Sequence, residues 1–306
     1  MREFDLVVVG AGLAGLTAGM YGARFGLRTA IVDQMGSGGQ IINIEKIENF
    51  PGFPQGIAGY ELGPLTQEQA EAAGAEFVMD TIESLEIDGS DRILQGAEEA
   101  LKASAVIIAA GSSLRALGVP GEERLMGKGV SHCASCDAAF FTGQETCVIG
   151  GGDSALDEAA VLAREASRVR IFHRGAAFDA QQAIINKVAA IPNIEPVFNT
   201  QVEEILGEDG VAGVRVRDLI TGETRIEEVA GVFIFVGLEP NTAFLRGVLE
   251  LDGTGHIRTD IMMRTSVEGV FAAGDIRQSS VAQLVSAAGD GATAAIAAYR
   301  YVRGLT

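Results

Sequence analysis

The segment Leu6-Val7-Val8-Val9-Gly10-Ala11-Gly12-Leu13-Ala14-Gly15 decides which fold this sequence predicts. Its apolar run is typical of a buried strand, and the glycines after it form a Gly-x-Gly-x-x-Gly turn. Small residues then continue at helical spacing through Thr17, Ala18 and Tyr21. A strand, a glycine turn and a helix in this order indicate a βαβ unit that binds a dinucleotide pyrophosphate.

An acidic residue at the end of the next expected strand supports this interpretation. Residues 28–33 read as a strand that ends in Asp33. Asp33 follows the turn at roughly the 20-residue spacing from which a carboxylate accepts hydrogen bonds from an adenosine ribose. A glycine motif alone also fits a tight turn without a ligand, but strand, helix and acid together favour a ligand. We therefore expect Gly10, Gly12 and Gly15 to approach a pyrophosphate.

A second turn of the same kind lies in the middle of the chain. The segment Val148-Ile149-Gly150-Gly151-Gly152-Asp153-Ser154-Ala155 again joins an expected strand to an expected helix. Gly150, Gly152 and Ala155 form a variant of the glycine motif, and residues 169–173 read as the following strand. The sequence therefore predicts two nucleotide sites on an α/β fold of two Rossmann-like, three-layer dinucleotide-binding domains.

The order of these elements suggests that one domain is inserted in the other. The second unit begins before any obvious linker, and a further strand followed by Gly274 occurs near the C-terminus. We expect a discontinuous first domain, 1–115 and 244–306, with a second domain, 116–243, between its two parts. Gly and Pro residues mark the expected joints at 114–121 and 237–242.

Composition limits the possible partners and compartments. The chain has 306 residues, 47% hydrophobic and 21% charged, which suits two globular domains. Its net charge of −18 argues against a nucleic-acid partner. We expect no leader, because the chain enters a strand directly from Met1, and no membrane span, because no apolar run reaches about 18 residues. Only three cysteines occur, so we expect a reducing cytoplasm.

The cysteine pair in Cys133-Ala134-Ser135-Cys136-Asp137 carries the chemistry. Two cysteines separated by two residues can close a reversible disulfide, and Asp137 is a carboxylate beside it. Half of a zinc site is the alternative, but a second ligand pair is missing, so we expect no metal. A dithiol this close to a nucleotide-binding turn suggests electron transfer.

Together these motifs resemble the low-molecular-weight thioredoxin reductase family over essentially the whole chain. The resemblance also rests on Gly39-Gln40, Glu48-Asn49-Phe50-Pro51-Gly52-Phe53-Pro54 and Phe271-Ala272-Ala273-Gly274-Asp275. It implies FAD on the first domain, a nicotinamide cofactor on the second, a homodimer, and a thioredoxin-like protein as substrate. The flavoprotein subunit of alkyl hydroperoxide reductases shares this core, but we expect no counterpart of its additional amino-terminal region, because the chain enters the first strand directly from Met1.

The resemblance also implies roles for individual residues. The expected FAD contacts are Gly10, Gly12, Gly15, Asp33, Gln40, Asn49, Gly274, Asp275 and Gln283. The helix that starts near Gln283 would direct its positive end at the isoalloxazine ring. The expected contacts of the nicotinamide nucleotide are Gly150, Gly152, Asp153, Ser154, Ala155, His173, Arg174 and Asp179.

In the family mechanism, electrons pass from nicotinamide to flavin and then to the disulfide. We expect Cys136 to face the flavin, Cys133 to face outward and attack the substrate disulfide, and Asp137 to transfer the proton. The family also implies that the inserted domain rotates about its two joints, because one disulfide cannot serve flavin and partner at once.

The segment expected to bind the adenosine phosphate departs from the family pattern. Members that use NADPH carry His-Arg-Arg and then Phe-Arg-Ala, whereas this chain has His173-Arg174-Gly175 and Phe178-Asp179-Ala180. A carboxylate repels a 2′-phosphate but accepts a hydrogen bond from a ribose hydroxyl. We therefore favour NADH over NADPH.

Electrons from ferredoxin or another donor are an alternative. The intact second glycine turn argues against this alternative. Ala282 also replaces an arginine of relatives.

Two further functions stay open from the sequence. The acceptor could be oxygen or peroxide, in an NADH oxidase or a peroxiredoxin-linked reductase. A non-enzymatic alternative is a flavin-containing redox sensor that binds a regulator. We assign no chemistry to Cys147, His132 or His256.

Overall fold

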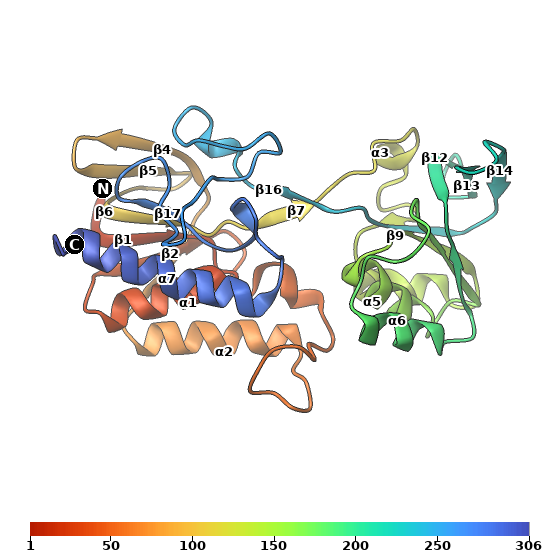
Figure 1. The fold of residues 1–306 in the computed structure, drawn as a ribbon, viewed down its shortest axis with the longest axis horizontal. Coiled ribbons are helices and arrows are strands. Elements are labelled where there is room, and N and C mark those ends of the chain that lie inside the picture. Colours follow the sequence, from red (N-terminus) through yellow and green to blue (C-terminus); the bar gives the residue numbers. More distant parts are fainter. Residues whose placement is uncertain (306) are drawn as a thin grey trace. The chain divides into compact units, whose positions relative to one another are not determined.

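The computed structural model describes residues 1–305, which form two compact units. One unit comprises Met1–Ser113 and Glu239–Thr306, and the other, Leu114–Leu238, is inserted between these segments. Each unit contains a largely parallel sheet with helices against it (Figure 1). The predicted α/β class with two Rossmann-like domains, one inserted in the other, is confirmed. Thr306, the last residue of the predicted range 244–306, lies outside the described residues.

A seven-stranded sheet forms the centre of the first unit. Its strands are β1 (Arg2–Val9), β2 (Thr29–Asp33), β3 (Glu76–Met79), β4 (Ile82–Asp88), β5 (Asp91–Gly96), β6 (Ala100–Ile108) and β17 (Val270–Ala272). The spatial order is β3-β2-β1-β6-β5-β4, and β17 also pairs with β6. β1 is parallel to both β2 and β6, so the glycine turn after β1 lies at the carboxyl end of the central strands.

Three helices lie on one side of this sheet in Figure 1, namely α1 (Leu13–Arg24), α2 (Gly59–Ala72) and α7 (Leu284–Val302). α1 and α7 approach each other so closely that a Cβ at Gly291 would lie 2.1 Å from the carbonyl oxygen of Ala14. Glycine at this position therefore allows the contact. Three short 3-10 helices complete the unit: η1 (Gly39–Asn43), η3 (Ala243–Leu245) and η4 (Gly274–Ile276). No helix within residues 1–305 is long and apolar enough to cross a membrane.

The inserted unit has a parallel five-stranded sheet and a smaller antiparallel one. The strands of the large sheet lie in the order β11 (Ile194–Val197), β10 (Arg168–Phe172), β9 (Glu145–Gly150), β15 (Gly231–Phe235) and β8 (Val130–Ser131). The small sheet contains β12 (Thr200–Leu206), β13 (Gly213–Asp218) and β14 (Thr224–Glu227). The helices are α3 (Glu122–Leu125), α4 (Ala134–Asp137), η2 (Ala138–Phe141), α5 (Asp153–Leu162) and α6 (Gln182–Ala189).

The chain passes between the units through two short strands that pair with each other, β7 (Ser112–Leu114) and β16 (Leu238–Pro240). The unit boundary at Leu238 lies before the predicted one at 243. Asn241 explains the difference, since its side-chain amide donates to the Ala110 carbonyl at 2.8 Å and its backbone N–H to the Gly111 carbonyl at 3.1 Å. These bonds attach residues after β16 to the first unit.

Candidate active site

A disulfide joins Cys133 and Cys136 at the short helix α4. Cys133 is the N-cap residue, and its sulfur accepts a 3.2 Å hydrogen bond from the backbone N–H of Cys136. Asp137 ends the helix and is half-buried. The three residues predicted for the redox centre therefore lie together. As whole residues, Cys136 is exposed and Cys133 is half-buried. Which of the two sulfurs faces the substrate stays a prediction.

Residues outside the Cys-x-x-Cys motif fix the start of this turn. The hydroxyl oxygen of Ser131 accepts a 3.0 Å hydrogen bond from the Cys133 N–H. Glu158 on α5 accepts a hydrogen bond from the Ala134 N–H, with 2.6 Å between nitrogen and Oε2. His132 Nδ1 lies 3.0 Å from the Ile234 carbonyl oxygen and is held by the sheet. The disulfide therefore has a rigid support on its amino-terminal side.

The second glycine turn leaves open space at the start of α5. A Cβ at Gly150 would lie 2.2 Å from the Phe235 carbonyl oxygen, and one at Gly151 would lie 2.2 Å from His173 Nδ1. Packing therefore requires glycine at both positions. At Gly152, by contrast, the nearest atom of residues 1–305 within 4 Å is the Asp179 carbonyl oxygen, at 3.7 Å. A phosphate could approach the backbone there.

Hydrogen bonds fasten the segment after β10 to this turn. The Asp179 N–H donates to the Gly151 carbonyl at 2.8 Å. Asp153, the first residue of α5, accepts from the backbone N–H of Gln181 at 2.8 Å and from its side-chain amide at 2.6 Å. Arg174 and Asp179 are both exposed. The predicted nucleotide contacts thus gather around one turn, while Gln181, which holds them there, was missed.

The remaining predicted contacts of the inserted unit have different surroundings. Ala155 is buried, and its Cβ would lie 2.9 Å from a Cβ at Gly150, so the two residues pack directly against each other in the turn. Ser154 is exposed. The His173 ring packs at a steep angle against Phe198, with 6.3 Å between centroids. The structure therefore gives His173 a packing role beside the turn.

In the first glycine turn, as in the second, some glycines are required by packing and one leaves the start of the helix open. Gly10 has φ +106°, and a Cβ there would lie 2.3 Å from the Ala109 carbonyl oxygen. A Cβ at Gly15 would lie 1.8 Å from the Gly10 carbonyl oxygen. Within residues 1–305, a Cβ at Gly12 would meet no atom within 4 Å. Gly10 and Gly15 are thus required by packing, whereas Gly12 leaves the start of α1 open.

Asp33 lies at the end of β2, beside this turn. Its Oδ2 accepts the Ala11 N–H at 2.8 Å, and its Oδ1 accepts the N–H groups of Met35 at 2.8 Å and Gly36 at 3.3 Å. The carboxylate therefore stabilises the turn itself. An ionised carboxylate has about four acceptor positions, so about one stays available for a ribose hydroxyl.

Two residues that lie far apart in the sequence meet at the start of α7. The Asn49 side-chain amide donates to Gln283 Oε1 at 3.1 Å, and Gln283 is the N-cap residue of α7. Ala282, directly before it, has φ +49°, an uncommon conformation for a residue with a side chain. Gln40 donates from its side-chain amide to the Ser112 carbonyl. The helix thus begins where the sequence predicted.

The Gly274-Asp275 pair forms the start of η4. Burial raises the pKa of the Asp275 carboxyl, and a 2.9 Å hydrogen bond from the Ser280 hydroxyl partly offsets this effect. The buried carboxylate of Asp290 accepts from the Gly274 N–H at 3.2 Å and from the Arg277 guanidinium. The pair Arg277 and Asp290 therefore anchors this corner, a role that spacing in the sequence did not indicate.

Phe140, four residues after Cys136, is the clearest surface feature that sequence reasoning missed. Its side chain is 75% exposed, whereas its neighbour Phe141 is buried and packs against Phe233. An exposed aromatic side chain beside a redox pair is a natural contact for another protein. The repeated Phe140-Phe141 was the available signal, since both side chains cannot face the same core.

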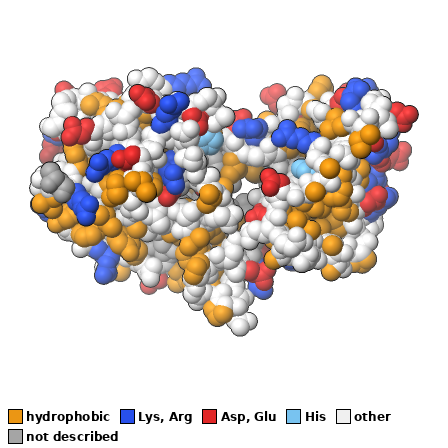
Figure 2. All heavy atoms as spheres, viewed as in Figure 1, with side chains coloured by type: hydrophobic (Ala, Val, Ile, Leu, Met, Phe, Trp, Pro, Cys, Tyr) orange, Lys and Arg blue, Asp and Glu red, His pale blue; other side chains and the backbone are white. Residues whose placement is uncertain are grey.

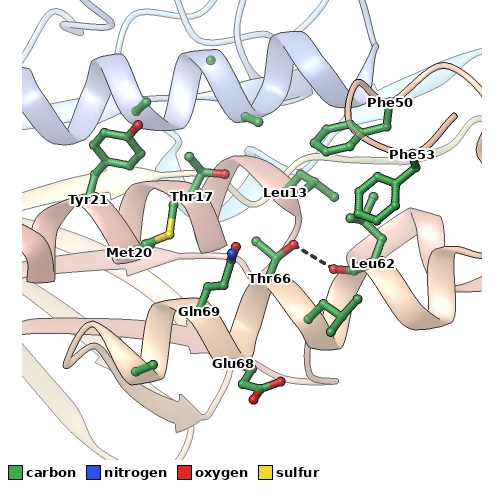
Figure 3. Close-up of a pocket in the computed structure, with 15 residues that line it drawn as sticks. Leu13, Thr17, Met20, Tyr21, Phe50, Phe53, Leu62, Thr66, Glu68 and Gln69 are labelled. Atoms are coloured by element: carbon green, nitrogen blue, oxygen red, sulfur yellow. Dashed lines mark hydrogen bonds between the residues drawn. The ribbon is translucent and has the colours of Figure 1, made fainter. Parts of the chain in front are cut away.

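An apolar pocket of about 810 Å³ lies among the helices of the first unit. Leu13, Thr17 and Met20 of α1, Leu62 and Leu65 of α2, and Ala288 of α7 contribute to its lining. In Figure 3, Phe50 and Phe53 lie at one end and Tyr21 at the other. Figure 2 shows hydrophobic side chains at the surface of this helical face.

Cys147 takes no part in this chemistry. It is a free and fully buried cysteine in β9, and burial raises the pKa of its thiol. A thiol that stays protonated is inert as a nucleophile. The structure agrees with the sequence analysis, which assigned no chemistry to Cys147.

Comparison with known proteins identifies the family. The model of the pyridine nucleotide-disulphide oxidoreductases matches residues 4–291. The chain is 43% identical to a thioredoxin reductase of Peptoclostridium litorale, over 99% of this chain and 98% of that protein. It is 41% identical to a thioredoxin reductase of Bacillus subtilis, over 99% and 96%.

Solved structures agree with the sequence relatives. Thioredoxin reductase from Lactococcus lactis is 39% identical, with a TM-score of 0.96 over 99% of this chain and 100% of that one. The enzyme from T. acidophilum is 37% identical, with a TM-score of 0.93 over 98% of each chain. The chain therefore belongs to the pyridine nucleotide-disulphide oxidoreductase family, as an FAD-dependent disulfide reductase of the thioredoxin reductase group.

Proposed function

We propose that this enzyme uses NADH, through FAD and the Cys133–Cys136 disulfide, to reduce the disulfide of a thioredoxin-like protein. The observation that carries the proposal is the disulfide at an exposed turn, in the same unit as an open glycine turn. The relatives named above are thioredoxin reductases, which supports the choice of substrate. We further propose a cytoplasmic location, because one reversible pair and one buried thiol suit a reducing compartment.

The residues of the first unit fit FAD. Open space at Gly12 and the start of α1 would receive the pyrophosphate, and Asp33 would hold the ribose. Asn49 and Gln283 meet at the start of α7, where helix N–H groups would favour negative charge on a reduced ring. When bound, FAD supplies two-electron transfer between a nicotinamide and the disulfide.

The residues of the inserted unit fit a nicotinamide dinucleotide without a 2′-phosphate. Gly152 leaves the start of α5 open to the pyrophosphate. Asp179 is exposed and attached to the same turn through its N–H, so its carboxylate would lie close to a nucleotide bound at this turn. Only Arg174 of the three arginines in NADPH-dependent members is retained. The charge balance favours NADH over NADPH.

The exposure of the two cysteine residues suggests their order of action. Cys136, the more exposed residue of the pair, would attack the partner disulfide and form a mixed disulfide. Cys133 would then attack Cys136, which re-forms the internal disulfide and releases the partner as a dithiol. Asp137, next to Cys136, would transfer the protons. This order reverses the roles that the sequence suggested, because Cys133 is half-buried.

The test of this function is an anaerobic titration of the FAD-loaded protein with NADH and, separately, NADPH, followed by flavin absorbance. Bleaching by NADH, followed by transfer to a thioredoxin-like disulfide, is the expected result. Bleaching by neither nucleotide would favour the ferredoxin-linked or sensor alternatives. Bleaching without transfer to any protein disulfide would favour an oxidase or peroxiredoxin-linked enzyme.

Phe140 provides a test of the protein substrate. We expect Phe140→Ala to raise KM for a thioredoxin-like protein about tenfold, because truncating an exposed aromatic contact at an interface costs on the order of 1–2 kcal/mol. Its kcat with a small aromatic disulfide should stay unchanged. Steady-state kinetics with both substrates make this comparison. Ile220→Ala removes a similarly exposed side chain (76%) from the β13–β14 turn and serves as the matched control.

The apolar helical face supports a homodimer. Leu65 lines the pocket and is 48% exposed, and monomeric proteins rarely expose large apolar patches. We expect analytical ultracentrifugation to give the wild-type protein twice the mass of one chain. The Leu65→Arg variant should give a mass closer to that of the monomer. Leu219→Arg, which changes a leucine of 45% exposure in the inserted unit, should stay dimeric. A monomeric wild type in analytical ultracentrifugation would contradict this assembly.

A further inference from the structure

On the basis of the proposed fit of the first unit to FAD, we propose that the Ser112 hydroxyl forms a hydrogen bond to the flavin half of that cofactor. Ser112 begins β7, directly after the strand β6 and a short turn, and the residue is only 5% exposed. Its Oγ is buried and has no hydrogen-bond partner among residues 1–305. A buried hydroxyl in this state has lost its hydrogen bonds to water without gaining others, so it calls for a partner.

A comparison with a second hydroxyl shows what is particular about Ser112. Thr146 in β9 also has a buried hydroxyl without a partner among the described residues. Thr146 is fully buried in the central strand of the inserted unit, between β10 and β15. Ser112, by contrast, follows Gly111, where a Cβ would meet no atom of residues 1–305 within 4 Å. The chain at Ser112 therefore borders open space, which a ligand can enter.

The surroundings of Ser112 place it beside the first glycine turn. Its backbone carbonyl accepts a hydrogen bond from the side-chain amide of Gln40, which lies in η1. A Cβ at Gly39, the neighbour of Gln40, would lie 3.4 Å from the Cα of Gly12. Gly12 is the position that leaves the start of α1 open for a pyrophosphate. Through η1, Ser112 is thus connected to the same site.

The order of the strands assigns Ser112 to the flavin half of this site. β1 lies between β2 and β6 and is parallel to both, so the carboxyl ends of the three strands lie at one edge of the sheet. Ligands of open α/β sheets bind at that edge. Asp33, at the end of β2, would hold the adenosine ribose, and Gly12 after β1 would receive the pyrophosphate. The other half of the dinucleotide then extends towards the end of β6, where Ser112 follows.

The chemistry of a hydroxyl suits this half of FAD. A serine hydroxyl donates one hydrogen bond and accepts up to two. The ribityl chain carries hydroxyl groups of the same kind, and the isoalloxazine ring carries oxygen and nitrogen acceptors. Binding of FAD would therefore satisfy a group that folding alone leaves without a partner. The hydroxyl should contribute to cofactor affinity and not to the stability of the cofactor-free chain.

The experiment compares Ser112→Ala with the wild type in the full-length chain after removal of FAD. Isothermal titration calorimetry measures the Kd for FAD and, separately, for ADP, which lacks the flavin half. We expect the Kd for FAD to rise about fivefold, the effect of one neutral hydrogen bond, while the Kd for ADP stays unchanged. Without FAD, the thermal midpoint of Ser112→Ala should equal or exceed that of the wild type, because the variant buries no unpaired hydroxyl.

Two matched variants separate this contact from a structural effect. Ser113→Ala removes the neighbouring hydroxyl, which is exposed and donates to Asn241 Oδ1 at 2.7 Å, and should leave the Kd for FAD unchanged. Thr146→Val removes the other unpaired hydroxyl and should also leave it unchanged.

Three results would overturn the role of Ser112. These are an unchanged Kd for FAD in Ser112→Ala, an equal rise in the Kd for FAD and for ADP, and a lower thermal midpoint of the cofactor-free variant. The first would mean that the hydroxyl serves another partner, such as water, and the second and third that the substitution disturbs the fold. A wild-type chain that binds ADP but no FAD would instead contradict the fit of the first unit to FAD, so the two failures are distinguishable.

Discussion

Replacement of either cysteine of the pair by serine is expected to reduce turnover with a thioredoxin-like disulfide by a factor on the order of 10³ or more, since no dithiol then remains to carry the electrons. Bleaching of the flavin by nicotinamide should persist, because Gly12 and Gly152 are untouched. Stopped-flow absorbance measures the flavin step, and a coupled assay measures the disulfide step. A normal rate of flavin reduction together with a lost rate of disulfide reduction would place the block in electron transfer after the flavin.

The two single variants should also differ from each other. In Cys133→Ser, the exposed Cys136 stays free to attack a partner disulfide, but no second sulfur can resolve the product. We therefore expect a stable mixed disulfide, visible as a shifted band on a non-reducing gel. Cys136→Ser leaves only the half-buried Cys133 and should form this adduct more slowly. Faster trapping by Cys136→Ser would restore the order that the sequence suggested.

Cys147→Ala is the matched cysteine control. Cys147 is buried and its raised pKa keeps the thiol protonated, so its loss should leave both electron-transfer steps unchanged. If Cys133→Ser retained turnover with its acceptor, the electrons would leave the flavin directly, and oxygen would become the candidate acceptor. The pair of experiments thus separates a dithiol relay from an oxidase.

The parts of this molecule that the sequence predicted are those whose signal is local. The strand, turn and helix around Gly10 and Gly150 each fit within one short segment, and the glycines are needed for contacts with the adjacent strand end. Cys133 and Cys136 are likewise close enough in the chain to predict their disulfide. Short-range steric requirements leave a readable pattern in the residues themselves.

The missed features depend on residues that meet only in the folded chain. Glu158 is one of several acids on α5, and nothing in its spacing shows that it accepts from Ala134. The apolar pocket combines Leu13 with Ala288, which lie at opposite ends of the sequence. The compact unit ends at Leu238 and not at the predicted 243 for the same reason, because Asn241 returns to bond with Ala110. Such contacts require the topology, which the local pattern does not encode.

The position that follows Arg174 illustrates how structure changes an interpretation of sequence. Gly175 stands where NADPH-dependent relatives carry a second arginine, so it first reads as a lost phosphate contact. A Cβ at Gly175 would lie 2.6 Å from His173 Nε2, and that ring is itself held against Gly151. Restoring an arginine at Gly175 would therefore disturb the glycine turn. A change of cofactor is better tested at the exposed Asp179.

Asp179→Arg is expected to change the preferred electron donor. The substitution replaces a carboxylate that repels a 2′-phosphate by a guanidinium that can pair with it, in concert with Arg174. Hydrogen bonds to charged groups contribute about 1.5–3 kcal/mol, so kcat/KM for NADPH should rise on the order of 10- to 100-fold. The value for NADH should fall by a smaller factor, because a ribose hydroxyl loses one acceptor. Anaerobic flavin bleaching with each nucleotide gives both values.

Two further variants identify the physical cause of this change. Asp179→Asn removes the repulsion without adding a positive charge, so it should give an intermediate gain with NADPH. Glu223→Arg makes the same change of charge at an exposed turn between β13 and β14, and it should leave the ratio of the NADH and NADPH rates at its wild-type value. An equal gain from Glu223→Arg would mean that net charge, and not the position of Asp179, governs the approach of the nucleotide. Because the Asp179 backbone is bonded to Gly151, the substituted side chains start from the same anchored position, and their effects can be compared directly.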